Sequence, residues 1–360
     1  MTRAPAPQPG ILEIDLYQGG ASKVEGVDDI VKLSSNENPH GPPQSAQDAA
    51  RAAAERMHLY PPTDHAALRA AIAAVHDLDP DRIVCGVGSD EIIHLLCQAY
   101  AGPGDEVLHT EHGFAMYAIS ARAAGATPVK VPERDRRVAV DTLLDGMTEA
   151  TRLVFIANPA NPTGTMIGGQ DMVRLADGLP DGCLLVLDGA YADYVADFDG
   201  GLGLAQGREN VIVTRTFSKM YGLGGMRVGW GYVPRDVAGV LNRIRGPFNL
   251  SNVALAAAEA AIRDRAFADR CRADNAAQRA RLRAGLAELG IPSDPSEANF
   301  VLARFADQNE AADCDAFLRT RGVIVRHPSG YGFPDCLRIT VGDAAGVDRL
   351  LETVAAWRAR

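Results

Sequence analysis

The chain has 360 residues, of which 47% are hydrophobic and 23% are charged, a composition typical of a globular enzyme with one large domain or two smaller ones. Its formal net charge of −10 argues against a nucleic-acid or anionic-membrane partner, because both favour basic surfaces. A small anionic ligand stays possible, because local arginines can oppose the overall sign.

The first residues, the lengths of the apolar runs and the cysteines indicate the compartment in which the protein works. The first residues, MTRAPAPQPG, lack an apolar core and predict a flexible arm, not a secretory signal. No apolar run approaches the roughly 20 residues that span a bilayer. The six cysteines are scattered, with no C-x-x-C pair and no histidine cluster at metal-ligand spacing. We therefore expect a cytoplasmic protein with reduced thiols and no metal.

Helical and strand-like segments alternate through the first two thirds of the chain. Residues 65–78 have helical spacing, residues 82–86 are strand-like, and residues 89–100 begin with a serine N-cap signal. Five short apolar runs follow: EVLHT, TPVKV, RLVFIAN, CLLVLDG and NVIVTRT. Such runs are typical of strands buried on both faces of a parallel sheet. They predict an α/β fold, with a mainly parallel central sheet flanked by helices.

The composition changes after about residue 245. Residues 251–289 are rich in alanine and arginine and predict one long helix or two in succession. Strand-like ANFVLARF, VIVRH and CLRITVG then alternate with helical segments, which predicts a smaller α+β domain. We expect three parts: residues 1–45 as an arm and part of the small domain, 46–245 as the large domain, and 246–360 as the small C-terminal domain.

Polar residues follow the expected strands at the edge where open α/β sheets bind ligands. IVCGVGSDEIIHLL leads from a strand through glycines into a helix, whose N–H groups and Ser89 suit a phosphate; an ordinary glycine turn with a serine cap is the alternative. After RLVFIAN, two Asn-Pro pairs favour a rigid loop presenting Asn161, or else a tight strand-to-helix connection.

Asp188 and Lys219 carry the most chemical information. Asp188 ends a buried run, where a carboxylate is costly without a cationic partner, unless it caps a helix. Lys219 precedes a glycine-rich run, and Arg227 could share an anion with Thr216, Ser218 and backbone donors. A desolvated lysine forms Schiff bases, although a surface lysine is the alternative when it is taken alone. Pyridoxal 5′-phosphate (PLP) has a phosphate, a ring nitrogen, a phenolic oxygen and an aldehyde, so it would use all these elements.

Nine motifs, in this order, resemble the fold-type I PLP-dependent aminotransferases and, among them, the histidinol-phosphate aminotransferase family. They are LSSNENPHGP, YPP, GSDEII, NPANPTG, DGAY, TFSKMYGLGGMR, PFNLSN, ANFVL and YGFPDCLRITVG. The resemblance covers essentially the whole chain from about residue 10. It implies ping-pong transamination between histidinol phosphate and 2-oxoglutarate in histidine biosynthesis, by a homodimer with shared active sites.

The resemblance implies roles for the matching residues. Lys219 would form the internal aldimine and shuttle the proton, Asp188 would pair with the pyridinium nitrogen, and Asn161 and Tyr191 would bind the phenolate oxygen. Phe114 would stack on the ring in place of the usual tyrosine. The phosphate would be held by Thr216, Ser218, Arg227 and the backbone of Ser89 and Asp90, with Tyr60 reaching it from the neighbouring subunit.

Substrate binding would fall to Tyr17, Asn38, Arg326 and Arg338. Arg338 would clamp the α-carboxylate with its planar fork, and Tyr17 and Arg326 would bind the distal phosphate. The segment LYQGG at residues 16–20 departs from the family's Pro-Tyr-x-Pro-Gly pattern. It leaves an aromatic amino acid aminotransferase as the alternative. A PLP-dependent threonine-phosphate decarboxylase is a less favoured alternative, raised because related sequences share the cofactor motifs. A PLP-fold regulator would need a DNA-binding extension or a lost lysine, and the sequence has neither.

Overall fold

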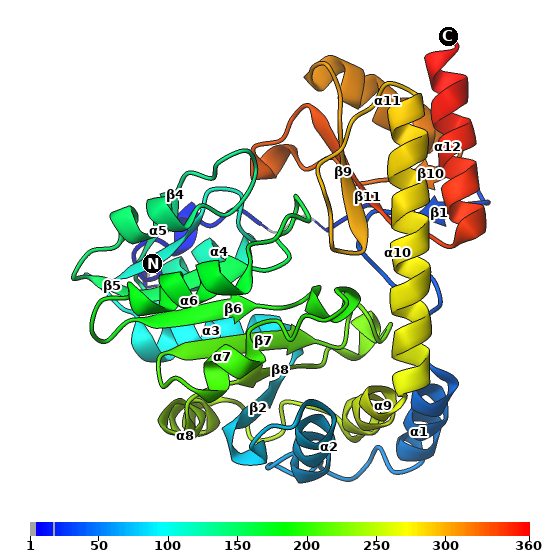
Figure 1. Ribbon diagram of the computed structural model, residues 1–360. Helices are drawn as coiled ribbons and strands as arrows, with labels where there is room; N and C mark the ends of the chain where they lie inside the picture. Colours follow the sequence, from blue (N-terminus) through cyan, green and yellow to red (C-terminus); the bar gives the residue numbers. More distant parts are fainter. Residues whose placement is uncertain (1–4, 17–18) are drawn as a thin grey trace, which may run out of the picture.

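A seven-stranded sheet lies at the centre of the computed structural model, which describes residues 5–16 and 19–360 (Figure 1). The strand order is β2-β8-β7-β6-β5-β3-β4. The strands are β2 (Ile83–Gly86), β3 (Glu106–Thr110), β4 (Thr127–Val131), β5 (Thr151–Ala157), β6 (Leu184–Asp188), β7 (Val211–Thr216) and β8 (Gly229–Tyr232). β8 runs antiparallel to β2 and β7, and the other adjacent pairs are parallel. The predicted α/β fold with a mainly parallel sheet is confirmed.

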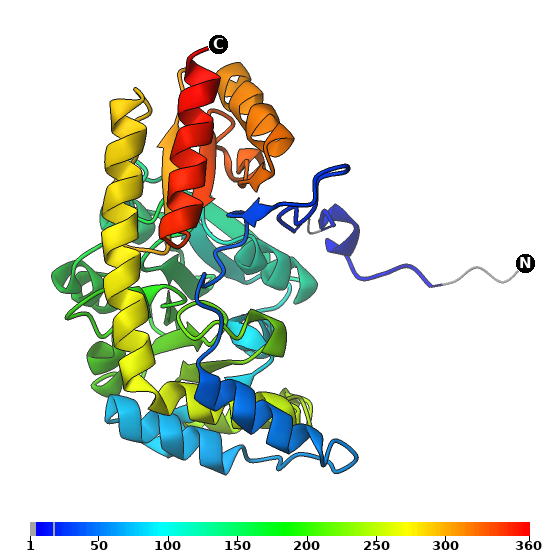
Figure 2. The ribbon, with the colours of Figure 1, turned by 90° about the vertical axis from the view of Figure 1, so that its right-hand side faces the viewer.

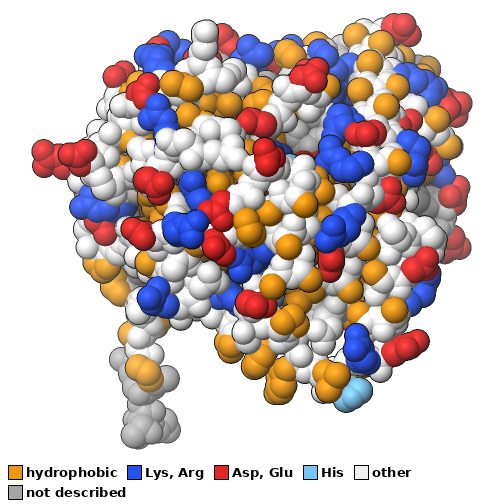
Figure 3. All heavy atoms as spheres, turned by 60° about the horizontal axis from the view of Figure 1, so that its bottom comes forward, with side chains coloured by type: hydrophobic (Ala, Val, Ile, Leu, Met, Phe, Trp, Pro, Cys, Tyr) orange, Lys and Arg blue, Asp and Glu red, His pale blue; other side chains and the backbone are white. Residues whose placement is uncertain are grey.

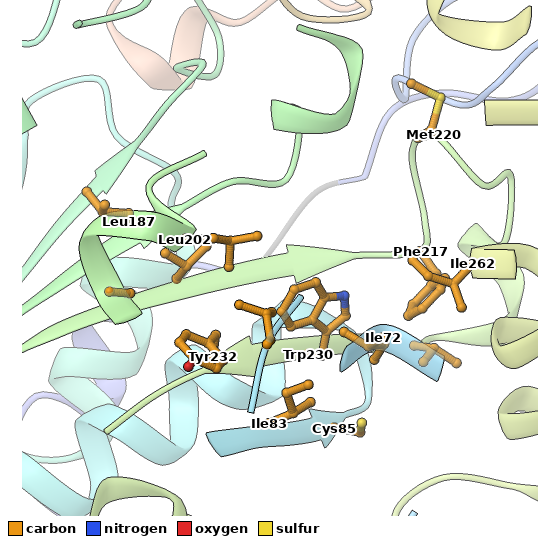
Figure 4. Close-up of a cluster of buried hydrophobic side chains, with 14 of the residues drawn as sticks. Ile72, Ile83, Cys85, Leu187, Leu202, Phe217, Met220, Trp230, Tyr232 and Ile262 are labelled. Carbon is orange, nitrogen blue, oxygen red and sulfur yellow. The ribbon is translucent and has the colours of Figure 1, made fainter. Parts of the chain in front are cut away.

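Helices cover both faces of this sheet, because alternate residues of each buried strand need an apolar neighbour on their own side. One face packs on α3 (Gly88–Tyr100), α4 (Met116–Ala123) and α8 (Arg235–Ile244). The other face packs on α2 (Ala66–His76), α5 (Val140–Gly146), α6 (Gly169–Asp177) and α7 (Leu202–Gln206). Figure 4 shows part of this second core, where Trp230 and Tyr232 of β8 lie beside Ile83 of β2.

The small domain has two short sheets and its own core. β9 (Phe300–Arg304) pairs antiparallel with β11 (Cys336–Thr340). β1 (Val31–Lys32) pairs in parallel with β10 (Val323–Ile324), which brings the N-terminal segment into this domain. The helices α10 (Arg265–Glu288), α11 (Gln308–Thr320) and α12 (Ala344–Arg358) complete the core.

The change between the two cores lies inside α10, not at residue 245 as the sequence predicted. α9 (Asn252–Arg263) packs against α1 (Gln44–Ala54) and α2, and the large core continues to Cys271, whereas Leu282 belongs to the small core. Asp264 separates α9 from α10, and its carboxylate accepts from the backbone N–H of Phe267. The helical stretch 251–289 is therefore two helices, and α10 spans both domains (Figure 1).

The N-terminal arm projects from the body on the same side as the connection after α1 (Figure 2). Its described residues include a short 3₁₀ turn, Ile11–Glu13. Within residues 5–16 and 19–360, no helix combines the length and the apolar character that crossing a membrane requires. The six cysteines are buried and unpaired.

Candidate active site

Both domains line one cavity of about 290 Å³ at the carboxyl ends of β5, β6 and β7. The volume is close to the lower end of the roughly 300–1,000 Å³ typical of small-molecule sites. The predicted site residues that line it are Ser89, Asp90, Phe114, Asn161, Asp188, Tyr191, Thr216, Ser218, Lys219, Arg227, Arg326 and Arg338. Residues more than 200 positions apart in the chain therefore meet at one edge of the sheet.

Lys219 lies in the turn after β7, partly buried in the cavity wall. Its Nζ donates to the carbonyl of Ser35 at 3.2 Å and lies 5.8 Å from the centre of the Tyr191 ring. Loss of water lowers the pKa of the amine from 10.5 to about 8, and the positive charges of Arg338 and Arg227 act in the same direction. The amine is therefore much easier to deprotonate than a surface lysine, as a nucleophilic lysine requires.

Asp188 is a buried carboxylate held by neutral donors. The hydroxyl of Tyr117 donates to Oδ2 at 2.8 Å, and the N–H of Ala190 and the hydroxyl of Thr214 donate to Oδ1 at 3.1 and 3.2 Å. Burial raises the pKa of Asp188, and these bonds oppose that rise. Within the described part of the chain, no lysine or arginine forms an ion pair with it. A cationic ligand group such as a protonated ring nitrogen fits this position.

The start of α3 forms a positive end of the cavity. Gly88 has a φ of +76°, which glycine adopts readily, and Ser89 follows it in the first turn. Arg227 donates to the hydroxyl of Ser218 and to the carboxylate of Asp90, both at 3.2 Å. Helix N–H groups, hydroxyls and a guanidinium together are the donors that a phosphate monoester binds.

Asn161 and Tyr191 are each oriented by a second side chain. The Oδ1 atom of Asn161 accepts from Nη1 of Arg338 at 2.7 Å, which leaves its amide N–H groups for another acceptor. The hydroxyl of Tyr191 accepts from Nδ2 of Asn36 at 2.9 Å, so its own proton is left for another acceptor too. Both arrangements suit a ligand with a negatively charged oxygen.

Arg326 and Arg338 form the other positive end. Their backbones pair, with N–H to carbonyl distances of 3.0 and 2.7 Å, so the two residues lie side by side. Arg338 donates to the carbonyl of Ser34 at 3.0 Å, and Arg326 donates to the carbonyl of Gly19 at 2.8 Å. The LYQGG segment therefore reaches the cavity through its glycines.

Three predicted site residues are not placed in this cavity. Asn38 was predicted to bind substrate, but it does not face the cavity. Its amide donates to the carbonyl of Met220 at 2.6 Å and contacts Cys271, so it holds the loop after Lys219. Tyr60 is 80% exposed and stacks on Phe248, with ring centres 4.5 Å apart. Tyr17 lies outside the described residues.

The sequence did not predict a role for Asn36 or Tyr117, although both contact residues that line the cavity. Asn36 lies in the LSSNENPHGP motif, and its φ of +56° turns the chain so that its amide meets Tyr191. Tyr117 lies three positions after Phe114, in the first turn of α4, and the two rings meet edge to face. That spacing was the available signal for Tyr117.

Comparison with known proteins agrees with this geometry. The family model for aminotransferase class I and II matches residues 28–354, so the chain belongs to that family. Proteins named histidinol-phosphate aminotransferase from Dinoroseobacter shibae and Ruegeria pomeroyi are 67% and 63% identical to it, with 98% of each chain covered. Within the class, the chain belongs to the histidinol-phosphate aminotransferases.

A solved structure shows the same fold. It is the histidinol-phosphate aminotransferase from Sinorhizobium meliloti in complex with pyridoxal-5′-phosphate, and its sequence is 27% identical to this chain. Its TM-score is 0.90, with 98% of this chain and 99% of that chain covered. Among the described residues, no group of three histidine, cysteine or acidic side chains is placed to hold a metal ion.

Proposed function

We propose that this protein is a PLP-dependent aminotransferase that transfers an amino group between histidinol phosphate and 2-oxoglutarate in histidine biosynthesis. One observation carries the proposal: a lysine of lowered pKa and a buried carboxylate without a cation line one cavity, between two positive ends. Relatives of this name at 63–67% identity over nearly the whole chain support it.

The donor set fits PLP along its whole length. When bound, PLP carries the amino group and takes up the electron pair that the substrate carbon releases. Asp188 would supply the negative charge for its ring nitrogen, and Asn161 and Tyr191 would supply donors for its phenolic oxygen. Phe114 would cover its ring. Its phosphate would be held by Thr216, Ser218, Arg227 and the backbone N–H groups of Ser89 and Asp90.

Lys219 has two tasks that need a neutral amine. It holds PLP covalently between substrates, and it moves a proton to and from the substrate carbon. Both tasks require a pKa close to the working pH, because a permanently protonated amine has no electron pair to offer. Desolvation and the flanking Arg338 and Arg227 provide this shift.

Arg326 and Arg338 bind the anionic groups of both substrates. 2-Oxoglutarate has two carboxylates, whereas histidinol phosphate has a phosphate ester and no carboxylate. A ping-pong enzyme must accept both in one cavity, and two adjacent guanidinium groups can pair with either anion through two N–H donors each.

We also propose a homodimer in which Tyr60 of one subunit completes the phosphate site of the other. Tyr60 and its neighbours form an exposed apolar patch of Met57 (74% exposed), Leu59 (52%), Tyr60 (80%) and Phe248 (45%). Orange side chains gather at the lower edge of the face in Figure 3. Such a patch on a protein that acts in water favours burial against a second copy.

Mixing two inactive variants tests the shared site. If Lys219 and Tyr60 of different subunits serve one site, a Lys219→Ala/Tyr60→Ala heterodimer regains one intact site. Random mixing then restores about a quarter of the wild-type activity, because half of the dimers are mixed and each has one good site. Activity no higher than that of the unmixed variants would contradict the shared site.

The enzyme itself is tested by its cofactor and its substrate preference. The purified protein should be yellow, and borohydride reduction should fix a pyridoxyl group on Lys219, as found by peptide mass mapping. The kcat/KM for histidinol phosphate, with 2-oxoglutarate as acceptor, should exceed that for phenylalanine. A protein that never takes up PLP would refute the proposal, and a preference for phenylalanine would favour an aromatic amino acid aminotransferase.

We place the enzyme in the cytoplasm. Histidine biosynthesis uses soluble metabolites, and the buried, unpaired state of the six cysteines suits a reducing compartment.

A further inference from the structure

We propose that Tyr117 is a positioning residue for the cofactor: it fixes the Asp188 carboxylate in its charged form and supports the Phe114 ring. This inference rests on the function proposed above. It concerns a side chain that does not line the cavity but contacts two groups that do.

Tyr117 is held rigidly. Its side chain on α4 is fully buried, and its ring stacks on Phe155 of β5, with centres 4.9 Å apart and planes 12° apart. Burial and the neighbouring Asp188 raise the pKa of the phenol well above 10. The hydroxyl therefore keeps its proton and donates it to Asp188.

The contact with Asp188 controls one particular oxygen. Ala190 and Thr214 both donate to Oδ1, whereas Tyr117 is the one described donor to Oδ2, at the shortest of the three distances. Without it, Oδ2 loses its described donor, and the bonds to Oδ1 alone restrict the rotation of the carboxylate. It also loses one of the interactions that oppose the burial-driven rise of its pKa. A protonated carboxyl group cannot neutralise a positively charged ring nitrogen.

The second contact reaches the residue that covers the ring. Tyr117 and Phe114 meet edge to face, with centres 5.9 Å apart and planes 89° apart. This is a favourable geometry for two aromatic rings. One rigid side chain thus supports both the group expected at the ring nitrogen and the group expected at the ring face.

The experiment removes the hydroxyl and keeps the ring. Tyr117→Phe should retain the contacts with Phe155 and Phe114 and lose only the bond to Asp188. The matched control is Tyr232→Phe, which deletes the same atom from another buried tyrosine, one that packs on Arg82 outside the cavity. Apoprotein prepared from each holoenzyme is titrated with PLP and with 1-deaza-PLP, in which a C–H group replaces the ring nitrogen.

We expect Tyr117→Phe to weaken PLP binding about tenfold or more, as for a lost hydrogen bond to a charged group. It should weaken 1-deaza-PLP binding less than about twofold, because that analogue has no ring N–H for Asp188 to hold. The acid limb of the kcat profile should move to higher pH in the same variant, because the pKa of Asp188 rises. Tyr232→Phe should change none of these.

Equal losses for the two cofactors would show a merely structural role and overturn the inference, as would no loss at all. In both cases wild-type binding of PLP would leave the proposed function standing. A wild-type protein that binds neither cofactor would instead overturn the proposed function, and this inference with it.

Discussion

Gly229 contributes both to the packing of the central sheet and to the phosphate end of the cavity. Gly229→Ala should therefore lower both the stability of the protein and its affinity for PLP. Gly229 begins β8 and lies against the start of α3. A Cβ atom at this position would lie 2.3 Å from the backbone N of Ser89 and 2.4 Å from the carbonyl carbon of Gly88. It would also lie 2.9 Å from the carbonyl oxygen of Arg215 on β7.

The cost follows from what would have to move. All three neighbours are backbone atoms, so no side-chain rotation relieves the contact. Ordinary contacts between such atoms are about 3.5 Å, so β8 and α3 must separate by about 1 Å. β8 is paired on both edges, with β2 and β7. We therefore expect a destabilisation at the upper end of the range for overpacking, about 3 kcal/mol.

The assay is urea unfolding of the apoprotein, followed by circular dichroism, together with the Kd for PLP. Displacing the Ser89 N–H should weaken PLP binding by about tenfold, the value of one hydrogen bond to a charged phosphate. Gly225→Ala is the control, because a Cβ atom there meets nothing within 4 Å, and it should change stability by less than about 0.5 kcal/mol. A Gly229→Ala protein with wild-type stability and wild-type PLP affinity would refute the reasoning.

Three further predictions concern other parts of the molecule. The rate at which apoprotein takes up PLP, measured by stopped-flow absorbance, should rise with pH with a midpoint near 8, because only the neutral amine of Lys219 reacts. Arg338→Met removes a positive neighbour of that amine and should move the midpoint to higher pH. Arg326→Ala should lower kcat/KM about tenfold or more for histidinol phosphate and much less for phenylalanine, and equal losses would count against Arg326 as a phosphate ligand. Asp264→Ala removes the cap of α10 and should cost about 1 kcal/mol in urea unfolding without changing kcat.

Lys219, Asp188 and Asn161 could be predicted from the sequence because each stands at the end of a short apolar run. Buried parallel strands produce such runs, and their carboxyl ends share one edge of the sheet. The chemistry was therefore visible in local sequence, one strand at a time. The boundary inside α10 was not visible, because a continuous helix shows no change of composition where it leaves one core for the other.

The directions of side chains in loops, and contacts between distant segments, could not be predicted from the sequence either. LSSNENPHGP offered several polar residues, and the sequence could not tell that the positive φ of Asn36 sends its amide toward Tyr191 while Asn38 turns to Met220. The bond from Tyr117 to Asp188 joins a helix to a strand end 71 positions away. No periodicity records such a contact, since it depends on how β5 and β6 are ordered in the sheet.

The charge of the cavity and the net charge of the whole chain have opposite signs. Both can affect binding, because they act over different distances. The cavity is lined by four basic side chains, Lys219, Arg227, Arg326 and Arg338, and by two acidic ones, Asp90 and Asp188. Asp90 pairs with Arg227, and Asp188 is held by neutral donors. A small anion inside the cavity meets guanidinium groups at contact distance. The surface carboxylates that make the chain −10 act over a Debye length of about 8 Å in salt. A nucleic acid is too large to enter the cavity and would meet mainly that surface, so the charges of this chain favour a phosphate monoester over a polyanion as the ligand.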